Sequence, residues 1–360
     1  MKKKTCNAND CAKKTSIGGQ ALIEGIMMRG PKTSAMAVRN PEGEIILETW
    51  ETKVGTRAKI FRLPIIRGVF NFVDSMRAGY KCLMRSAEIA GLDELENDKK
   101  EPKAEGEQTE LSEVSTAAET DKSETEEKNG KKKEGSSAMM TVIMVLSVVL
   151  GVALALFLFT LLPSLIYKWC ASVIPFLSSE KSAVNSLIKS VFEGVLRIAI
   201  LVGYMLLVTL MKDIRRTFQY HGAEHKTIFC YENGLELTVE NVRRQRRFHP
   251  RCGTSFLILM LIVSIFISFF IDPLFLLITG SVPHVLVRSL VKILMLPLVM
   301  GIGYELIKLA GRHDNLFTRI LSAPGMWLQH VTVLEPDDDM IECAITAFVE
   351  VIPKDESDAY

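Results

Sequence analysis

The chain of 360 residues contains a long segment without any charge. No Asp, Glu, Lys or Arg occurs between Gly135 and Tyr167, although charged residues make up 24% of the whole sequence. An apolar segment of this length exceeds the roughly 20 residues that a helix needs to cross a bilayer. The sequence therefore argues against a wholly water-soluble protein and predicts at least one membrane span.

The sequence also lacks a secretory signal and a disulfide framework. The basic N-terminus, Met1–Thr5, is not followed by an apolar stretch, so we expect the chain to begin in the cytoplasm and to insert through internal spans. Cys6 and Cys11 could bind a metal, although an incidental pair is favoured. The cysteines are scattered and are expected to be reduced thiols, Cys170 alone lying near the outside: Cys6, Cys11, Cys82, Cys170, Cys230, Cys252 and Cys343.

Three further apolar segments predict spans at Val191–Met211, at Ser255–Leu277, which Asp272-Pro273 interrupts, and at Val285–Leu309. The second and fourth spans carry charged residues, among them Glu193 and Arg197, which are four positions apart and favour an internal ion pair. The fold class is therefore mainly α: a polytopic membrane protein with four transmembrane helices in a membrane domain over 138–310. Small cytoplasmic α/β elements are expected from the N- and C-terminal segments.

The distribution of basic residues predicts the orientation. The loop Lys212–Arg251 carries nine Lys or Arg, whereas the connection between the first two spans carries Lys168 and Lys181 and the short connection between the last two carries essentially none. Because basic loops stay in the cytoplasm, we expect a multi-pass protein of the cell membrane with both termini inside.

Two segments outside the spans are expected to fold. Residues 16–91 predict a cytoplasmic unit with turns at Gly18-Gly19 and Arg29–Pro31, a hairpin from 36 to 49, and an amphipathic helix over 64–90. That helix could pack on a soluble core or lie in the membrane interface. In the C-terminal cytoplasmic segment, 311–360, Gln329–Leu334 could be a strand, and the acidic run Asp337–Asp339 favours a helix start before Met340–Val349 over a metal site.

The remaining segments are expected to be disordered. Residues 1–15 form a polar tail. Residues 92–137 form a linker rich in Glu, Lys, Ser, Thr and Gly, without aromatic residues or periodicity. Such a composition buries too little apolar surface to offset the entropy of ordering.

Chemistry is expected in the polar loop 212–254. His221 and His225 are four residues apart and would share one face of a helix, and Glu224 completes the spacing H-x-x-E-H, which is typical of inverted zinc hydrolases. His-x-x-x-His on a helix chelates zinc well, but a catalytic zinc needs a third ligand. The sequence offers three candidates: His249, Cys252 and Glu305.

Three functional hypotheses remain open. In an enzyme, Glu224 would act as the general base and the metal would be a divalent ion, zinc first. In a scaffold, a closed His/Cys shell would only tie the loop together. A transporter would need a water-accessible path lined by Glu193, Arg197 or Glu305.

The same loop contains a basic cluster whose favoured interpretation is a topology determinant beside anionic lipid; a specific site for phosphate or a lipid head group is the alternative. Nothing indicates nucleic acid beyond the charge itself. The cluster consists of Arg243, Arg244, Arg246, Arg247 and Arg251.

Several of these strings resemble the YqhQ family of bacterial membrane proteins, a domain of unknown function. The resemblance covers most of the chain outside the tail and linker and runs through Gly18–Pro31, Arg67-Gly68, His221–Lys226, His249–Ser255 and Glu335–Asp338. The family carries the label of a predicted metal-dependent enzyme, with no established reaction. The resemblance implies a membrane location and a metal site, but no substrate. Our leading hypothesis is a metal-dependent hydrolase that acts on a peptide or lipid-linked substrate at the membrane surface.

Overall fold

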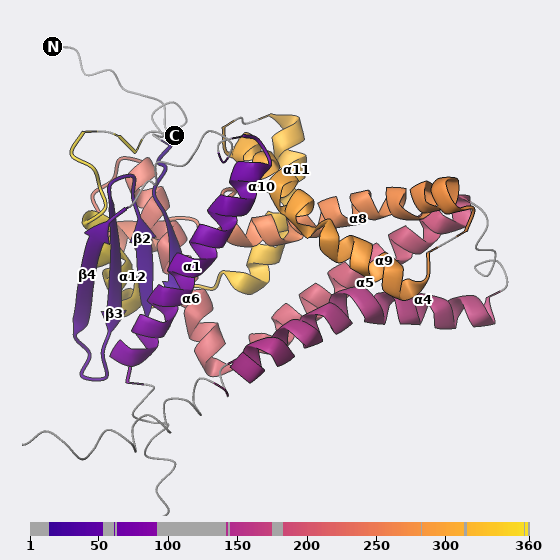
Figure 1. Cartoon of the computed structure of the whole chain (residues 1–360). Coiled ribbons are helices and arrows are strands. Elements are labelled where there is room, and N and C mark those ends of the chain that lie inside the picture. Colours follow the sequence, from indigo (N-terminus) through magenta and orange to yellow (C-terminus); the bar gives the residue numbers. More distant parts are fainter. Residues whose placement is uncertain are drawn as a thin grey trace, which may run out of the picture.

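The computed structural model describes residues 14–358, apart from positions 53–60, 62, 92–141, 143–144, 175–182, 282, 313–314 and 356. The predicted linker 92–137 and nearly all of the predicted tail 1–15 lie outside the described residues. The described residues are mainly helical. They form a head built on a small sheet, from which a group of long helices extends (Figure 1).

The sheet is a four-stranded antiparallel meander in the order β1-β2-β3-β4. The predicted hairpin is confirmed, since β3 and β4 pair with Arg39 opposite Ile45. Gly18 and Gly19, expected in a turn, lie in β1. Strand β2 is difficult to recognise because apolar side chains occupy both of its faces, so it lacks the polar–apolar alternation of a half-exposed strand. The strands are β1 (Gly18–Leu22), β2 (Gly25–Arg29), β3 (Thr33–Arg39) and β4 (Ile45–Glu51).

Helices cover the sheet on both faces (Figure 1). One face packs on α6 (Lys212–Glu232) and α12 (Asp338–Val349), with the short α7 (Val239–Arg243) beside them. The other face packs on α1 (Ile66–Ile89) through a smaller cluster around Cys82. The predicted helices over 64–90 and 340–349 are confirmed. The predicted polar loop 212–254, by contrast, begins with a helix of 21 residues.

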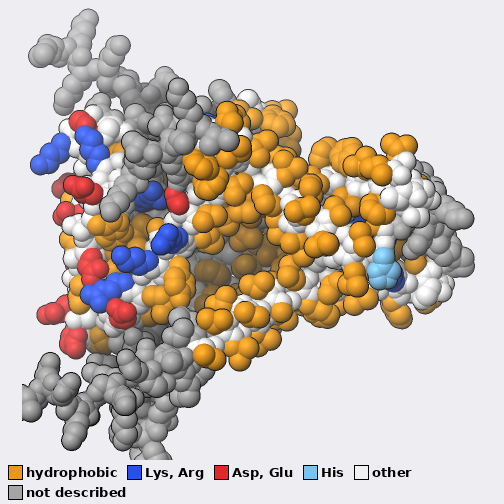
Figure 2. All heavy atoms as spheres, in the orientation of Figure 1, with side chains coloured by type: hydrophobic (Ala, Val, Ile, Leu, Met, Phe, Trp, Pro, Cys, Tyr) orange, Lys and Arg blue, Asp and Glu red, His pale blue; other side chains and the backbone are white. Residues whose placement is uncertain are grey.

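Among the described residues, three helices are long and apolar enough to cross a membrane. They are Val145–Val173, which includes the π-turn η2 (Phe157–Leu161) and α4 (Leu162–Val173); Leu187–Val208 within α5 (Ala183–Val208); and α8 (Gly253–Thr279). On the face shown in Figure 2, hydrophobic side chains cover the long helices, whereas charged side chains gather on the head. This surface is compatible with a membrane protein.

The predicted fourth span is a bent pair of helices. Helices α9 (Val285–Leu294) and α10 (Leu296–Arg312) meet at an angle of 46° and qualify as a span only together. Pro297 follows the break, and a proline there removes a backbone donor and hinders continuation of α9. Pro273 has no such effect: α8 runs through it and ends at Thr279, where Gly280 follows with a φ of +71°.

The prediction of a strand at Gln329–Leu334 is wrong. Residues up to Thr332 belong to α11 (Leu316–Thr332), which begins with a capping box between Asn315 and Thr318. Helix α11 packs along α8, and a Cβ on Gly325 would lie 2.6 Å from the backbone of Ser255. Tertiary packing on α8 therefore overrides the local preference of the β-branched residues 331–333.

Candidate metal centre

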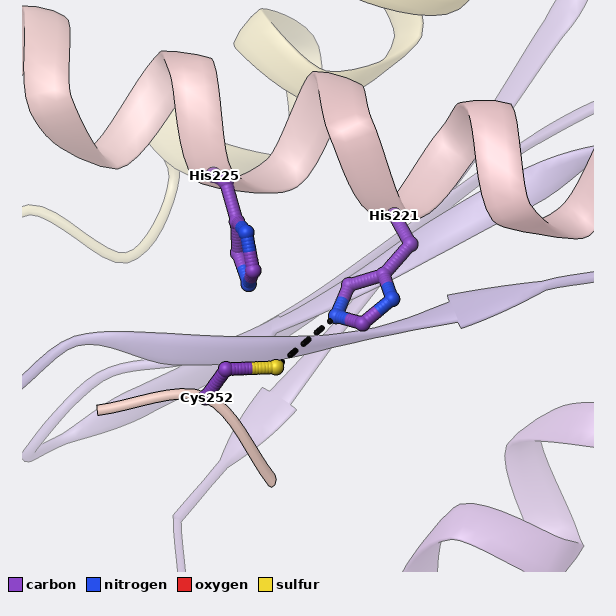
Figure 3. A group of neighbouring side chains, drawn as sticks. All are labelled: His221, His225 and Cys252. Carbon is purple, nitrogen blue, oxygen red and sulfur yellow. Dashed lines mark hydrogen bonds between the residues drawn. The ribbon is translucent and has the colours of Figure 1, made fainter. Parts of the chain in front are cut away.

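His221 and His225 project from consecutive turns of α6 toward the start of α8. Their ring centroids are 4.5 Å apart, as expected for side chains four residues apart on a helix. His225 is 2% exposed, and His221 is partly exposed. Figure 3 shows both rings directed to the same side of α6, where a third side chain approaches them.

That third side chain is Cys252, the residue that precedes α8. Its Sγ accepts a hydrogen bond from the backbone N–H of Thr254 and lies 3.2 Å from Nε2 of His221 (Figure 3). The thiol is buried, with 5% exposure for the residue. One ligand atom from each of His221, His225 and Cys252 lies within 4.8 Å of the other two, so the three form a group of metal-binding geometry. We refer to these three residues as the His/Cys group.

Backbone carbonyl groups fix the orientation of both imidazoles. Nδ1 of His221 lies 3.0 Å from the carbonyl oxygen of Thr332, and Nδ1 of His225 lies 2.5 Å from that of Arg247. A carbonyl oxygen only accepts, so each Nδ1 carries the proton and each neutral ring keeps Nε2 as a lone-pair donor. Metal-binding histidines are commonly held by such a bond on the second nitrogen.

The donor set fits a borderline-soft transition metal. Two imidazole nitrogens and one thiolate are ligands that zinc prefers, and three protein ligands with a further position for water or substrate are typical of catalytic zinc sites. Carboxylate-rich sites for magnesium or calcium have a different composition. The arrangement can therefore hold zinc or a metal of similar preference.

Gly222 allows the chain to cross α6 beside the His/Cys group. A Cβ at this position would lie 1.9 Å from the carbonyl oxygen of Leu334, and the N–H of Leu334 donates to the carbonyl of Phe218 at 2.9 Å. The segment after α11 therefore rests on the backbone of α6, which places the carbonyl of Thr332 beside His221. The close approach of Leu334 therefore explains why a glycine stands at position 222 of the His221–His225 motif.

His249, a predicted ligand, lies next to the group but outside it. Its ring centroid is 5.6 Å from that of His225, and its Nε2 is 3.8 Å from Oε2 of Glu232. Its Nδ1 accepts a hydrogen bond from the backbone N–H of Arg251. Burial, together with His225 and Arg251, lowers the pKa of His249 to about 4 despite the opposing effect of Glu232. His249 is therefore neutral at pH 7 and supports the ring packing around the group.

Glu305, another predicted ligand, is held elsewhere. Its carboxylate accepts a bidentate pair of hydrogen bonds from Arg67 of α1, one of them 2.7 Å long, and it also lies 3.4 Å from the backbone nitrogen of Ile65. The structure does not place it in the His/Cys group. An acid within an apolar helix needs a partner, and Arg67 supplies the positive charge that the sequence prediction assigned to a metal.

Glu224, the predicted general base, faces the sheet. Oε1 of Glu224 accepts a hydrogen bond of 3.0 Å from the backbone N–H of Gly19 in β1. A Cβ on Gly19 would lie 3.0 Å from the Glu224 carboxyl carbon, so the missing side chain permits this approach. Glu224 is 5% exposed, and burial raises its pKa above the ordinary value. Its carboxylate is not among the three clustered ligand atoms.

The predicted basic cluster is largely paired within the chain. Arg243 bonds Asp338, Arg244 bonds Glu240, Arg247 bonds Glu335 at 3.1 Å, and Arg251 bonds Glu232. The guanidinium of Arg246 lies over the ring of Phe229 at 4.6 Å. These contacts neutralise much of the charge that the sequence offers to an anionic lipid.

A second buried polar group lies among the long helices. The predicted pair of Glu193 and Arg197 is confirmed at 2.9 Å, and Arg288 and Lys292 of α9 bond the same carboxylate at 2.9 and 2.8 Å. Ser164 of α4 donates a fourth bond. One carboxylate thus connects α4, α5 and α9. Arg288, Lys292 and Ser164 were not part of the predicted pair, because no local spacing relates them to Glu193.

Comparison with known proteins places the chain in a family. A family described as a protein of unknown function, DUF1385, matches residues 63–354. The chain belongs to this family. It is also 32% identical over 341 residues to the uncharacterized protein YqhQ of Bacillus subtilis (strain 168), which covers 94% of this chain and 92% of the relative. No solved structure matches the chain. The resemblance to the YqhQ family is therefore confirmed, and the His/Cys group lies within the matched region.

Proposed function

We propose that this family member is a multi-pass membrane protein that binds a divalent transition metal, zinc first, through His221, His225 and Cys252, and that it hydrolyses a substrate at the membrane surface. The observation that carries the proposal is the orientation of the two imidazoles. Both Nδ1 atoms are tied to carbonyl oxygens, so both Nε2 lone pairs remain for a ligand beside the Cys252 thiol.

The site residues have separate tasks in this proposal. A bound divalent metal supplies a Lewis acid that polarises a carbonyl or phosphoryl oxygen. His221, His225 and Cys252 would hold it. Glu224, one residue before His225, would accept the proton of the attacking water through the carboxylate oxygen that Gly19 does not bind.

Four crossings with both termini on one side are supported by the assembly of the head. Its core combines residues before the first span, residues of α6 between the second and third, and residues of α12 after the last. Segments that pack together lie on the same side of a membrane, so an even number of crossings separates each pair. Helices α9 and α10 would then cross as one bent span. The basic residues of α6 and α7 favour the cytoplasm as the side of the head. A reporter fused to the C-terminus should therefore show a cytoplasmic location.

Metal analysis of the purified full-length protein tests the binding step. We expect about one zinc-class ion per chain, lost in His221→Ala, His225→Ala and Cys252→Ala. His330→Ala is the matched control, because His330 is exposed, bonds the carbonyl oxygen of Trp327 in its own helix and packs on Phe248 without joining the His/Cys group. Cobalt-loaded protein should show a thiolate charge-transfer band that Cys252→Ser removes. Metal-free protein, or equal metal content in all variants, would overturn the proposal.

A structural role of the same metal is the second candidate, and the engagement of Glu224 with Gly19 favours it. Glu224→Gln distinguishes the two roles, because the amide oxygen still accepts from Gly19 while the proton acceptor is lost. Metal content and thermal unfolding should match wild type in either case. A hydrolase loses its ability to complement a deletion strain, whereas a scaffold retains it.

A further inference from the structure

We infer that an apolar cavity beside the His/Cys group holds the hydrocarbon chain of an anionic membrane lipid, which is the substrate class of the proposed site. Only the role of the lipid as a substrate rests on the proposed function. The binding of the lipid is inferred from the geometry of the cavity. The cavity has a volume of about 230 Å³ and lies where four helices meet.

The walls of the cavity touch the candidate metal ligands. Thr332 lines the cavity, and its carbonyl oxygen is the acceptor for Nδ1 of His221. Thr254 lines the cavity as well, and its Oγ1 lies 3.1 Å from Sγ of Cys252. A molecule in the cavity would therefore contact Thr332 and Thr254, and each of these residues contacts a member of the His/Cys group.

The rest of the lining is apolar, and part of it belongs to the ends of α5 and α8, two helices long enough to cross a membrane. Met205 and Val208 come from the last turns of α5, Leu257 from the first turns of α8, and Ile214 and Phe218 from α6. Whole small-molecule sites usually measure roughly 300–1,000 Å³, so this cavity suits part of a ligand, such as a chain segment.

The surroundings of the cavity point to a lipid as the occupant. The corner between α5 and α6 is strongly apolar on its surface, with Leu207 65%, Leu210 79% and Met211 57% exposed. Such a corner is stable inside a bilayer and costly in water. Because the cavity lies at the same ends of α5 and α8, its mouth would open at the depth of lipid chains near the head groups.

Two basic residues next to the lining in sequence favour an anionic head group. Lys212 and Arg215 lie exposed in the first turn of α6, next to Ile214 of the lining. Neither forms an ion pair within the described part of the chain, unlike Arg216, which bonds Glu24. Each basic residue near such a surface strengthens binding of anionic lipid about fivefold.

Photo-crosslinking tests the inference on the full-length protein. The protein is placed in nanodiscs whose phosphatidylglycerol carries a diazirine on its acyl chain, and crosslinked peptides are mapped by mass spectrometry. We expect crosslinks to concentrate on the lining around Phe218 and Leu257. Ile214→Trp, which fills the cavity, should reduce them severalfold, whereas Leu207→Trp, which adds the same ring at an exposed position, should not. Metal content is measured in parallel.

The other outcomes separate the two proposals. Replacing Lys212 and Arg215 with Ala should weaken crosslinking by a phosphatidylglycerol probe and leave a phosphatidylcholine probe unchanged. Crosslinks spread evenly along the spans would overturn the inference whatever the metal content. Specific crosslinks in metal-free protein would retain it and overturn the metal centre. If Ile214→Trp does not fold, two measurements still test the inference. They are the crosslink map of the wild-type protein and the comparison of the two lipid probes on the Lys212 and Arg215 variant.

Discussion

The Nδ1 atom of His221 bonds the carbonyl oxygen of Thr332 at 3.0 Å, although 111 residues separate the two in the chain. This contact joins the helix that carries both imidazoles to the end of α11, which packs on α8. The geometry of the candidate centre therefore depends on residues distant from the H-x-x-E-H motif.

Gly222→Ala should disturb the centre without changing any ligand. The new methyl group would lie only 1.9 Å from the carbonyl oxygen of Leu334, so the crossing segment must move away from α6. Overpacking of this kind costs about 1–3 kcal/mol. We expect a lower melting temperature and weaker metal retention. Gly203→Ala, where a Cβ meets nothing within 4 Å, is the control; equal behaviour of both variants would contradict the steric role.

Glu305→Gln should leave the metal content unchanged, since the carboxylate serves Arg67. Its effect should appear in stability instead. A double-mutant cycle with Arg67→Met, followed by thermal unfolding, should give a coupling of about 0.5–3 kcal/mol between the two positions. Loss of metal in Glu305→Gln, with no coupling to Arg67, would restore Glu305 as a ligand.

Glu193→Ala should destabilise the long helices strongly. The substitution leaves Arg197, Arg288 and Lys292 buried without their shared carboxylate. Breaking a buried ion pair from one side costs about 3–5 kcal/mol. Unfolding of the detergent-solubilised protein measures the effect, and Thr209→Ala is the comparison, because Thr209 is partly exposed and its hydroxyl donates to the carbonyl oxygen of Leu206 in α5. An unchanged unfolding midpoint would show that water or lipid compensates these charges.

His249 should make the head less stable in mild acid. Its pKa of about 4 in the folded protein lies below the unperturbed 6.5, so the unfolded state binds the proton more readily between these values. The stabilisation is complete above pH 6.5 and is lost as the pH falls toward 4. We expect unfolding measured with a chelator present to show this slope, and His249→Gln to reduce it. An identical pH dependence of unfolding in both proteins would show that other titratable groups cause it.

The sequence revealed those parts of the site that depend on local spacing. His221 and His225 share a helix face because four residues separate them, and Cys252 was one of three candidates for the next ligand. The choice among Cys252, His249 and Glu305 depends on the way α6, α8 and α1 pack, which no local pattern encodes. The carbonyls of Thr332 and Arg247 escaped notice because every residue carries the same backbone acceptor.

The fold was predictable to a similar extent. Long apolar helices and the β3–β4 hairpin follow from hydrophobicity and periodicity. Strand β2 could not be predicted in this way. Ile26 and Met28 face one helical layer and Met27 faces the other, so the strand is apolar on both faces and shows no alternation. The continuation of α11 to Thr332 likewise depends on its contact with α8, because the β-branched residues at its end favour a strand.

The assembly of the head from three separated segments has a consequence for synthesis. Strands β1–β3, helix α6 and helix α12 share one core, and the last of these leaves the ribosome only after every long helix has been made. His221 receives its carbonyl partner from Thr332 at the same late stage. In the proposed four-crossing topology, a chain with a misplaced helix would have α12 on the wrong side of the membrane, and the core that α12 completes would stay open.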